Sequence, residues 1–235
     1  METVATESRS ERCIEEWWRT HFGWGVLAAC LLAVCACGGG AKPLSEEYGF
    51  LSLGRYVADE FQPALSFEVG KGWEVSELQQ KPFFELSREY EGGDYFVFIS
   101  FNNPPSRVSD PRNPNKLVPA PKNWVSWYQE HPYLETSEPQ PTSVGGVQGR
   151  RFATVASTLP EDYYSEDCLG IGVPLWPLLH GHHWCADEGY TDQAIVLDSI
   201  EGETMIIDVW SGSGTFEKVL PDAKEVLDTV EWEGA

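Results

Sequence analysis

Three pairs of short segments rich in apolar residues, each pair joined at glycine residues, place the tightest constraint on how this chain folds. Along residues 95–101 both faces are largely apolar, which is the pattern of a central strand covered on both sides, whereas Leu65, Phe67 and Val69 alternate with polar or small residues as in a half-buried strand. Glycine readily takes the positive φ that a tight hairpin turn requires. The predicted hairpins cover residues 83–101, 142–157 and 193–210, and Glu201-Gly202 forms the clearest turn. Because a hairpin joins neighbouring antiparallel strands, these segments predict a mostly antiparallel sheet.

Two amphipathic segments predict helices that pack on this sheet. Apolar residues three and four positions apart predict one helix over residues 121–131 and a second over residues 216–227. The second helix is expected to have Thr215 as its N-cap and to kink or restart at Pro221, which lacks a backbone N–H. The elements show no strand–helix–strand alternation. The predicted class is therefore α+β, a mostly antiparallel β-sheet with helices packed on it.

Two long stretches are predicted to contain no regular element. Residues 102–121 include six prolines, which fix φ and remove backbone donors, so this stretch is predicted to be a proline-rich loop. Residues 159–192 show no clear period and are predicted to be irregular. Long loops of this kind are either functional or tolerant of insertion.

The order of elements and three local motifs resemble the PsbP-like α/β/α sandwich found in many small exported lipoproteins. The residues that carry the resemblance are 67–73, with F-x-x-x-x-G-W spacing, the Gly145-Gly146 hairpin, and the ending at 216–232. The resemblance covers most of residues 63–233. It implies a binding or assembly role, and it transfers no catalytic residue because the family has no shared catalytic set.

An uncharged run over residues 24–36 precedes the predicted domain. Thirteen residues rise about 20 Å as a helix, which is short of the roughly 30 Å hydrocarbon core of a bilayer. This length fits the apolar region of a secretory signal peptide better than a spanning helix. Two alternatives stay open, an uncleaved signal anchor and a short buried helix with incidental cysteines.

The end of this run, Val34-Cys35-Ala36-Cys37 followed by three glycines, resembles the bacterial lipobox. The resemblance implies that Cys37 carries a diacylglyceryl thioether and becomes the first residue after cleavage. The protein would then be anchored to the extracytoplasmic face of the bacterial cell membrane. Cys30 and Cys35 are the rival positions: Cys30 leaves too short an apolar run before it, and Cys35 follows Val34, where a small residue is expected.

These boundaries divide the chain into a signal peptide at 1–37, a flexible tether at 38–62 and a single domain at 63–235. The formal net charge is −21, of which the first 37 residues, with three Arg and five Glu, supply only −2. A domain this acidic repels phosphate backbones, so the composition argues against nucleic-acid binding. The charge fits solubility outside the cell, or recruitment of Ca²⁺ or cationic ligands.

Cys168 and Cys185 are the two cysteines of the predicted domain. An exported chain with two such thiols is expected to join them. In the chain-entropy model, a disulfide that closes a loop of this size contributes about 3 kcal/mol. The sequence therefore predicts a disulfide loop over residues 168–185.

The densest group of metal-ligand residue types is His180, His182 and His183, followed by Cys185. Imidazole with nearby carboxylates suits Zn²⁺ or Cu²⁺. No HExxH or paired CxxC spacing accompanies the group, and a solvated loop held by the disulfide is the competing interpretation. No cofactor is predicted in the leading hypothesis, and Zn or Ca is the alternative.

Trp124, Trp127 and Trp176 are the predicted ligand-contacting residues, because aromatic rings can stack on sugars or face lipids. The alternative for the same rings is an aromatic core. Carboxylate pairs such as Asp198 and Asp208 are too common in so acidic a chain for spacing to nominate a general acid and base.

Together these patterns predict a membrane-anchored extracytoplasmic lipoprotein that is not an enzyme. It would bind a small apolar or glycan ligand, or a protein partner, in a cleft between the sheet and the loop at 168–185. The alternative function is a metal-binding protein or a metal-dependent hydrolase that uses His180, His182 and His183.

Overall fold

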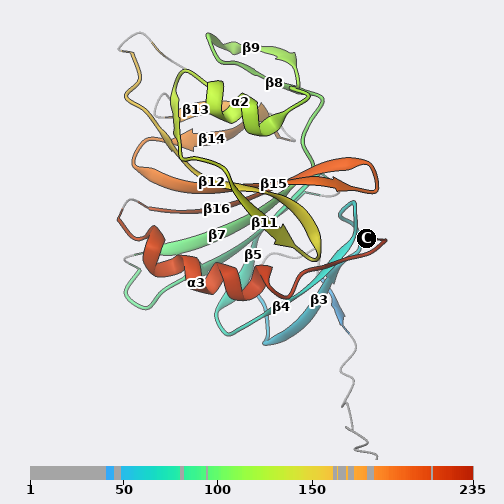
Figure 1. Ribbon diagram of the computed structural model, residues 1–235. Coiled ribbons are helices and arrows are strands. Elements are labelled where there is room, and N and C mark those ends of the chain that lie inside the picture. The colour runs from blue at the N-terminus through green and yellow to red at the C-terminus, as the bar shows by residue number, and fades with distance from the viewer. Residues whose placement is uncertain are drawn as a thin grey trace, which may run out of the picture. The chain divides into compact units, whose positions relative to one another are not determined.

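The structure is a computed structural model (Figure 1) that describes residues 41–44, 49–79, 82–93, 95–160, 163, 168, 172–178, 183–212 and 214–234. These residues belong to one compact unit, Gly40–Ala235. The predicted signal peptide and lipidation site, and also His180 and His182, lie outside the described residues. Within the described part of the chain, no helix is both long and apolar enough to cross a bilayer.

A central antiparallel sheet organises the described chain. Its strands follow the order β10-β12-β15-β16-β7-β6-β5-β2, and β11 pairs with β12. The strands are β2 (Gly49–Phe50), β5 (Trp73–Gln79), β6 (Phe83–Glu89), β7 (Phe96–Asn102), β10 (Leu134–Thr136), β11 (Gln140–Val144), β12 (Val147–Ala156), β15 (Tyr190–Ile200) and β16 (Glu203–Gly212). All neighbouring pairs in this sheet are antiparallel, which confirms the sheet type predicted from the hairpins.

The three predicted hairpins are present as β6–β7, β11–β12 and β15–β16. At the turn of the last one, Glu201 and Gly202 both have positive φ, 55° and 93°, as a two-residue hairpin turn requires. β7 lies between β6 and β16, and its Val97, Ile99 and Phe101 are fully buried. The local turn chemistry therefore sets the pairing of the sheet's central strands.

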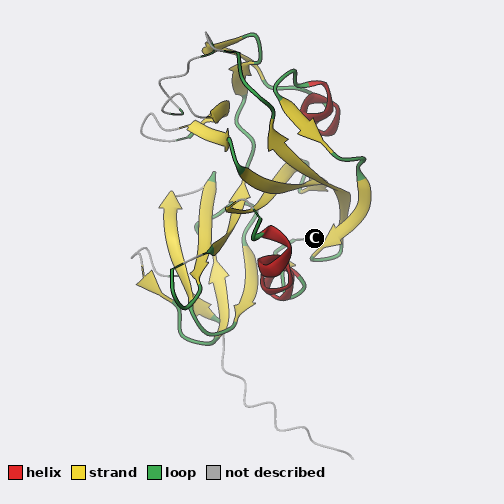
Figure 2. Cartoon of the chain, turned by 90° about the vertical axis from the view of Figure 1, so that its left-hand side faces the viewer, coloured by secondary structure: helices red, strands yellow, loops and turns green. Residues whose placement is uncertain are grey.

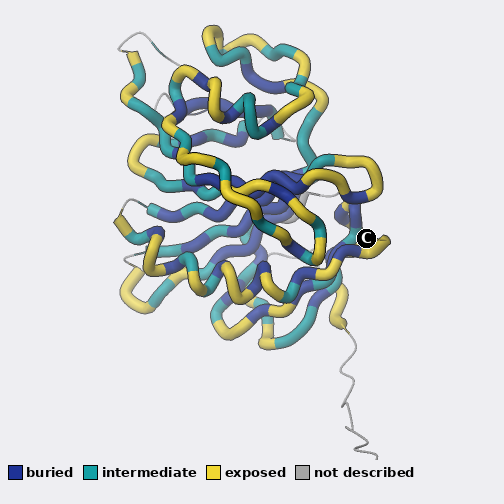
Figure 3. The backbone as a smooth tube through the Cα atoms, in the orientation of Figure 1, coloured by how far each residue is buried: buried dark blue, intermediate teal, exposed yellow. Residues whose placement is uncertain are grey.

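One face of the central sheet is covered by α3 (Phe216–Leu227) and by a second, four-stranded sheet (Figure 1). The second sheet has the order β1-β3-β4-β17, formed by β1 (Lys42–Pro43), β3 (Gly54–Ala58), β4 (Leu65–Val69) and β17 (Glu231–Trp232). Alternate side chains of β4, namely Leu65, Phe67 and Val69, enter the apolar core between the layers, where the buried backbone is concentrated (Figure 3).

α3 is a single helix that continues through Pro221, so it does not restart at the proline. Thr215 occupies the N-cap position, as predicted. Its hydroxyl donates to the carbonyl of Gly212 at 2.7 Å and makes no capping hydrogen bond to the helix. Burial of Val219, Ala223 and other apolar side chains against the sheet stabilises the helix in spite of the proline.

The opposite face of the sheet is covered by α2 (Trp124–Glu130) and two small strand ribbons. The ribbons are formed by β8 (Arg107–Asp110) with β9 (Asn113–Pro119), and by β13 (Gly172–Pro177) with β14 (His183–Asp187). α2 begins three residues later than predicted, because Asn123 caps it by accepting a hydrogen bond from the backbone N–H of Ser126 at 3.0 Å. A second apolar core lies between these elements and the sheet.

Both stretches predicted to be irregular contain strands, so those two predictions are wrong. The proline-rich stretch forms the β8–β9 ribbon. Pro111 lies in its turn, and Pro114 and Pro119 lie in β9. Among the described strands, β9 pairs only with β8. An edge strand accepts proline because its outward N–H groups need no ladder partner. Residues 159–192 hold the β13–β14 ribbon and the start of β15.

Strands dominate the described chain, which contains two helices (Figure 2). The helices pack against opposite faces of the central sheet, each in one of the two apolar cores. The fold is therefore β-rich, and a balanced α+β class with an α/β/α layering is too helical a description. The physical reason is that the small sheet and the two ribbons cover much of the apolar area that the prediction assigned to helices.

Part of the segment predicted as a tether also belongs to the fold. β3 pairs with β4 from Gly54 to Ala58, and its Tyr56 and Ala58 are buried in the first core. β2 extends the edge of the central sheet by pairing with β5. The ordered domain therefore begins before residue 63.

Candidate functional site

A cavity of about 430 Å³ lies between the central sheet and the disulfide-linked β14. Its lining residues come from β6, β7, β12, β15 and β16 on the sheet side, and from β14 with Cys168 on the other side. We call it the carboxylate pocket, because the acidic side chains Glu85, Asp187 and Asp192 line it. The cavity lies where the sequence predicts a cleft, between the sheet and the loop at 168–185.

Strand register gathers five polar side chains on the sheet face toward this pocket. Thr154 of β12 lies opposite Asp192 of β15, while Asp208 of β16 lies opposite Ser100 of β7, which in turn lies opposite Glu85 of β6. Residues directly opposite one another on antiparallel strands point to the same face. All five side chains are buried. A polar row thus crosses an otherwise apolar face.

Glu85 is the member of this row whose carboxylate is well supplied with donors. Ser100 Oγ donates to its Oε2 at 2.6 Å and Ser76 Oγ donates to its Oε1 at 2.9 Å. The indole Nε1 of Trp210 also donates to Oε2, at 3.3 Å. These bonds offset the loss of water around a buried carboxylate.

Asp208 and Asp192 are less well satisfied. Asn102 Nδ2 donates to Asp208 Oδ2 at 2.9 Å, while Asp208 Oδ1 and Asp192 Oδ1 have no hydrogen-bond partner among the described residues. Burial raises the pKa of Asp192 to about 8. Burial, followed by the negative charges of Asp192 and Glu85, raises the pKa of Asp208 well above its usual range. In both carboxyl groups the raised pKa favours the protonated, neutral form.

Tyr128 of α2 contributes a buried phenol to the same environment. Its hydroxyl has no hydrogen-bond partner in the described part of the chain, and its pKa is raised well above the usual value, chiefly by burial and further by the charges of Asp208 and Asp192. Tyr128 therefore belongs to the second apolar core, on the same side of the sheet as the polar row.

Three buried polar atoms that lack a hydrogen-bond partner among the described residues belong to side chains lining the carboxylate pocket. They are Oγ1 of Thr154, Nε1 of Trp184 and Oδ1 of Asp192, and the three residues are 1%, 8% and 8% exposed. Each unpaired buried polar group costs about 1–3 kcal/mol. A polar ligand in the pocket could satisfy a hydroxyl, an indole donor and a carboxyl oxygen together.

Aromatic rings form the apolar walls of the pocket. Trp210 stacks on Phe98 with 4.0 Å between ring centroids and an interplanar angle of 6°. Trp184 lies edge-on to Trp210 at 6.2 Å and packs against Phe83 at 5.9 Å. The pocket thus combines large aromatic surfaces with buried carboxyl groups.

The three tryptophans predicted to contact a ligand lie together, but in the second core. Ring centroids of Trp124 are 5.6 Å from Trp127 and 5.5 Å from Trp176. Trp124 and Trp176 are only 6% and 1% exposed, and Trp127 is half-buried. None of the three is among the described residues that line the carboxylate pocket. Their packing is that of the alternative interpretation, an aromatic core between α2 and β13.

The predicted disulfide between Cys168 and Cys185 is present, with 6.0 Å between the two Cα atoms. It engages the cysteine nearest the histidines, so that sulfur is not available as a metal ligand. His183 lies on β14 and lines the carboxylate pocket, whereas His180 and His182 lie outside the described residues. The described residues contain no group of three or more His, Cys, Asp or Glu side chains placed to hold a metal ion.

Sequence reasoning missed the carboxyl groups that matter in the pocket. It paired Asp198 with Asp208, but the register places Ala194 opposite Asp208, and Asp198 is exposed. Asp192 lies two residues before Ala194 and therefore on the same face as Asp208. A usable signal was present, because Asp208 interrupts the otherwise apolar run of β16 at a core-facing position.

No family model and no curated protein matches this chain. Among solved structures, one similar chain is a protein from Bacteroides thetaiotaomicron, with 11% identity and a TM-score of 0.34, over 73% of this chain and 46% of that chain. This chain thus spans about half the length of that protein. Another is LpqN, involved in cell envelope biogenesis of Mycobacterium tuberculosis, with 9% identity and a TM-score of 0.33, over 79% of this chain and 90% of that chain. TM-scores this low do not assign the chain to either fold.

Proposed function

We propose that this chain is a non-enzymatic extracytoplasmic lipoprotein, anchored in the bacterial cell membrane through Cys37, that binds a small ligand in the carboxylate pocket. The uncharged leader and its lipobox-like end support the anchor. The Cys168–Cys185 disulfide supports an oxidising compartment outside the cytoplasm. Kinship with the PsbP-like family is part of the same proposal and rests on the three sequence motifs.

The observation that carries the binding proposal is the set of polar atoms of Thr154, Trp184 and Asp192 that find no partner among the described residues around one cavity. Buried polar groups in folded proteins are normally paired, so three orphaned groups at one cavity indicate a place where a ligand completes the hydrogen bonds. Binding is favoured over two-carboxylate catalysis because Glu85 is already held by hydroxyl and indole donors.

Filling the pocket should remove a bound ligand. Ala156 lines the cavity from β12, so Ala156→Trp is expected to occupy the space and abolish a small-molecule adduct seen by native mass spectrometry of protein extracted from its own membrane. Arg151→Trp is the matched control, because Arg151 is exposed on the opposite face of the same strand. An adduct that survives Ala156→Trp would place the ligand elsewhere.

Cys37→Ser should abolish labelling by radioactive palmitate and shift the protein from the membrane to the soluble fraction, because the variant has no thiol to receive the diacylglyceryl group. Cys30→Ser and Cys35→Ser serve as controls and should keep both the label and the membrane location. Unchanged labelling of Cys37→Ser with loss in one of the controls would move the anchor to that cysteine.

A further inference from the structure

We infer that the carboxylate pocket selects an organic cation, an ammonium group on an apolar body, over neutral or anionic molecules of similar shape. The inference rests on the proposed function, because it names the class of ligand that the same pocket takes. It follows from the charges, the unpartnered atoms and the aromatic walls of the cavity.

Three of the side chains that line the pocket carry carboxyl groups. Glu85, Asp187 and Asp192 line it, and none of its described lining residues is Lys or Arg. Asp208 adds a fourth carboxyl group behind this wall. A carboxylate or phosphate ligand would lie beside these acids with no Lys or Arg among the described lining residues to pair with it, whereas a cation could pair with the carboxylate of Asp192.

The unpartnered atoms match an ammonium group. Asp192 Oδ1 and Thr154 Oγ1 can both accept hydrogen bonds, and their residues lie opposite each other on β15 and β12. An ammonium group donates up to three hydrogen bonds and can reach two acceptors at once. The indole N–H of Trp184 also lacks a partner among the described residues. Because it is a donor, it can bind an acceptor atom on the body of the ligand.

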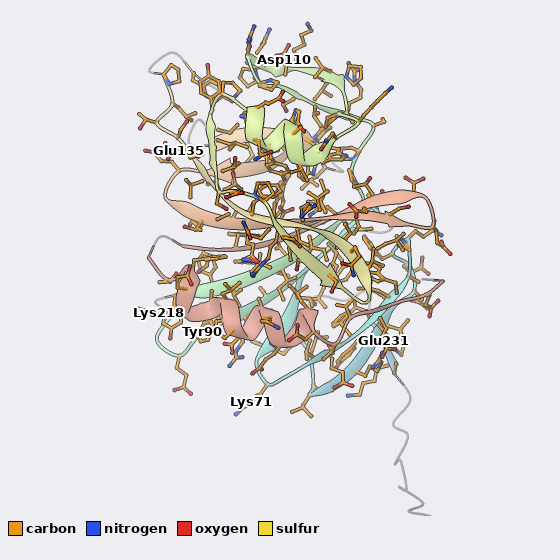
Figure 4. All side chains as sticks on the ribbon, in the orientation of Figure 1. Lys71, Tyr90, Asp110, Glu135, Lys218 and Glu231 are labelled. Carbon is orange, nitrogen blue, oxygen red and sulfur yellow. A yellow bond between two sulfur atoms is a disulfide. The ribbon has the colours of Figure 1, made fainter. Side chains whose placement is uncertain are left out.

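The aromatic rings that line the pocket suit the apolar body of such a ligand. Aromatic faces attract cations through their quadrupoles, most strongly for Trp, and the attraction is greatest where water is excluded. The rings that line the cavity and give an apolar body extensive contact are Trp184, Trp210, Phe83 and Phe98. Charged side chains such as Lys71, Glu135 and Glu231 lie on the outside of the fold (Figure 4), and the net charge of −21 attracts cations toward the protein.

Binding of a cation should release a proton from Asp192. In the empty protein burial keeps the pKa of this carboxyl at about 8, so below pH 8 the group is mainly neutral. The incoming ammonium group pairs with the carboxylate, and the displaced proton goes to solvent. The titratable groups around Asp192 are Tyr190 on its own strand β15, Asp208 on β16, Glu85 on β6, Tyr128 on α2, and His183 and Asp187 on β14.

The test compares three probes of similar shape, 2-phenylethylamine, 2-phenylethanol and phenylacetate, by isothermal titration calorimetry with the full chain in detergent. At pH 8 the amine is expected to bind at least about tenfold more tightly than the alcohol, a difference of about 1.4 kcal/mol, and phenylacetate more weakly than either. Amine affinity should rise by about tenfold per pH unit from pH 6 and level off near pH 8, while alcohol affinity stays constant.

Asp192→Asn keeps the shape of the side chain and removes its charge, so it should bring amine and alcohol affinities together and remove the pH dependence. Asp198→Asn is the control, because Asp198 is an exposed carboxylate on the same strand. The inference is overturned if the alcohol binds as tightly as the amine, if phenylacetate binds best, or if Asp192→Asn keeps the preference. It is also overturned if no probe binds. The proposed function is tested separately, by the small-molecule adduct in native mass spectrometry and its loss in Ala156→Trp.

Discussion

Asp192→Asn is expected to have a large effect on how the stability of this protein depends on pH. Between pH 5 and pH 8 the native protein should lose about 1.4 kcal/mol per pH unit relative to the variant, on the order of 4 kcal/mol in total. Chemical unfolding of both proteins at several pH values, monitored by tryptophan fluorescence, measures this difference.

The sign follows from the raised pKa of Asp192, which burial moves to about 8 in the folded chain, whereas an unfolded aspartate has an ordinary pKa near 4. Between these values the folded state holds a proton that the unfolded state releases. Stability from this group is therefore complete at low pH and is lost as pH rises toward 8. The amide that replaces the carboxyl group in Asp192→Asn stays neutral throughout and would show no such loss.

Another buried group that affects stability in part of this pH range, His131, is common to both proteins. Burial lowers the pKa of His131 to about 4, so the folded state resists protonation and this group lowers stability as pH falls from about 6.5 to 4. Its contribution cancels in the comparison with Asp192→Asn. Asp198→Asn should leave the native pH profile unchanged. Parallel profiles for the native protein and Asp192→Asn would show that Asp192 ionises freely in the fold.

Removal of the disulfide is expected to have the second large effect. The double variant Cys168→Ala, Cys185→Ala should lower the free energy of unfolding by about 3 kcal/mol, because the link closes a loop between residues 17 apart in sequence. The midpoint of urea unfolding measures the loss. Both cysteines line the carboxylate pocket, so the same variant should also bind 2-phenylethylamine more weakly.

Reduction of the native protein provides the control for this prediction. A reductant should lower the unfolding midpoint of the native protein to that of the double variant, and it should leave the double variant unchanged. If the double variant unfolds at the native midpoint, the covalent link contributes nothing and the β13–β14 ribbon is held by its apolar contacts alone.

The hairpins could be predicted from sequence because their signal is local. A glycine-containing turn such as Glu201-Gly202 and the alternation on either side fix the pairing of β15 with β16 without reference to the rest of the chain. The β8–β9 ribbon could not be predicted from sequence, because Pro114 and Pro119 are unfavourable in a strand unless that strand is an edge. Whether a strand is an edge depends on what packs beside it.

The candidate pocket was only partly predictable for the same reason. The loop at 168–185 and its disulfide indicated where a cleft would lie, since two cysteines in a chain predicted to be exported are expected to pair. The pocket's key carboxyl group was not identified, because Asp192 reaches the face of Asp208 only through the register of β15 with β16. The sequence could not tell whether the tryptophans at 124, 127 and 176 are exposed to a ligand or packed in a core, because the residue type is the same in both cases. Their packing in the structure distinguishes the two interpretations.

By itself, the sequence determined the acidic charge and the local hairpins and predicted a leader with a lipobox-like end, because each depends on residues adjacent in the chain. Only the tertiary structure decided that the fold is β-rich, that Trp124 and Trp176 are buried in a core with Trp127 packed against it, and that Thr154, Trp184 and Asp192 meet around one cavity. The physical reason is that burial and strand register are set by contacts between segments far apart in sequence. The same contacts raise the pKa of Asp192 by removing water from around it.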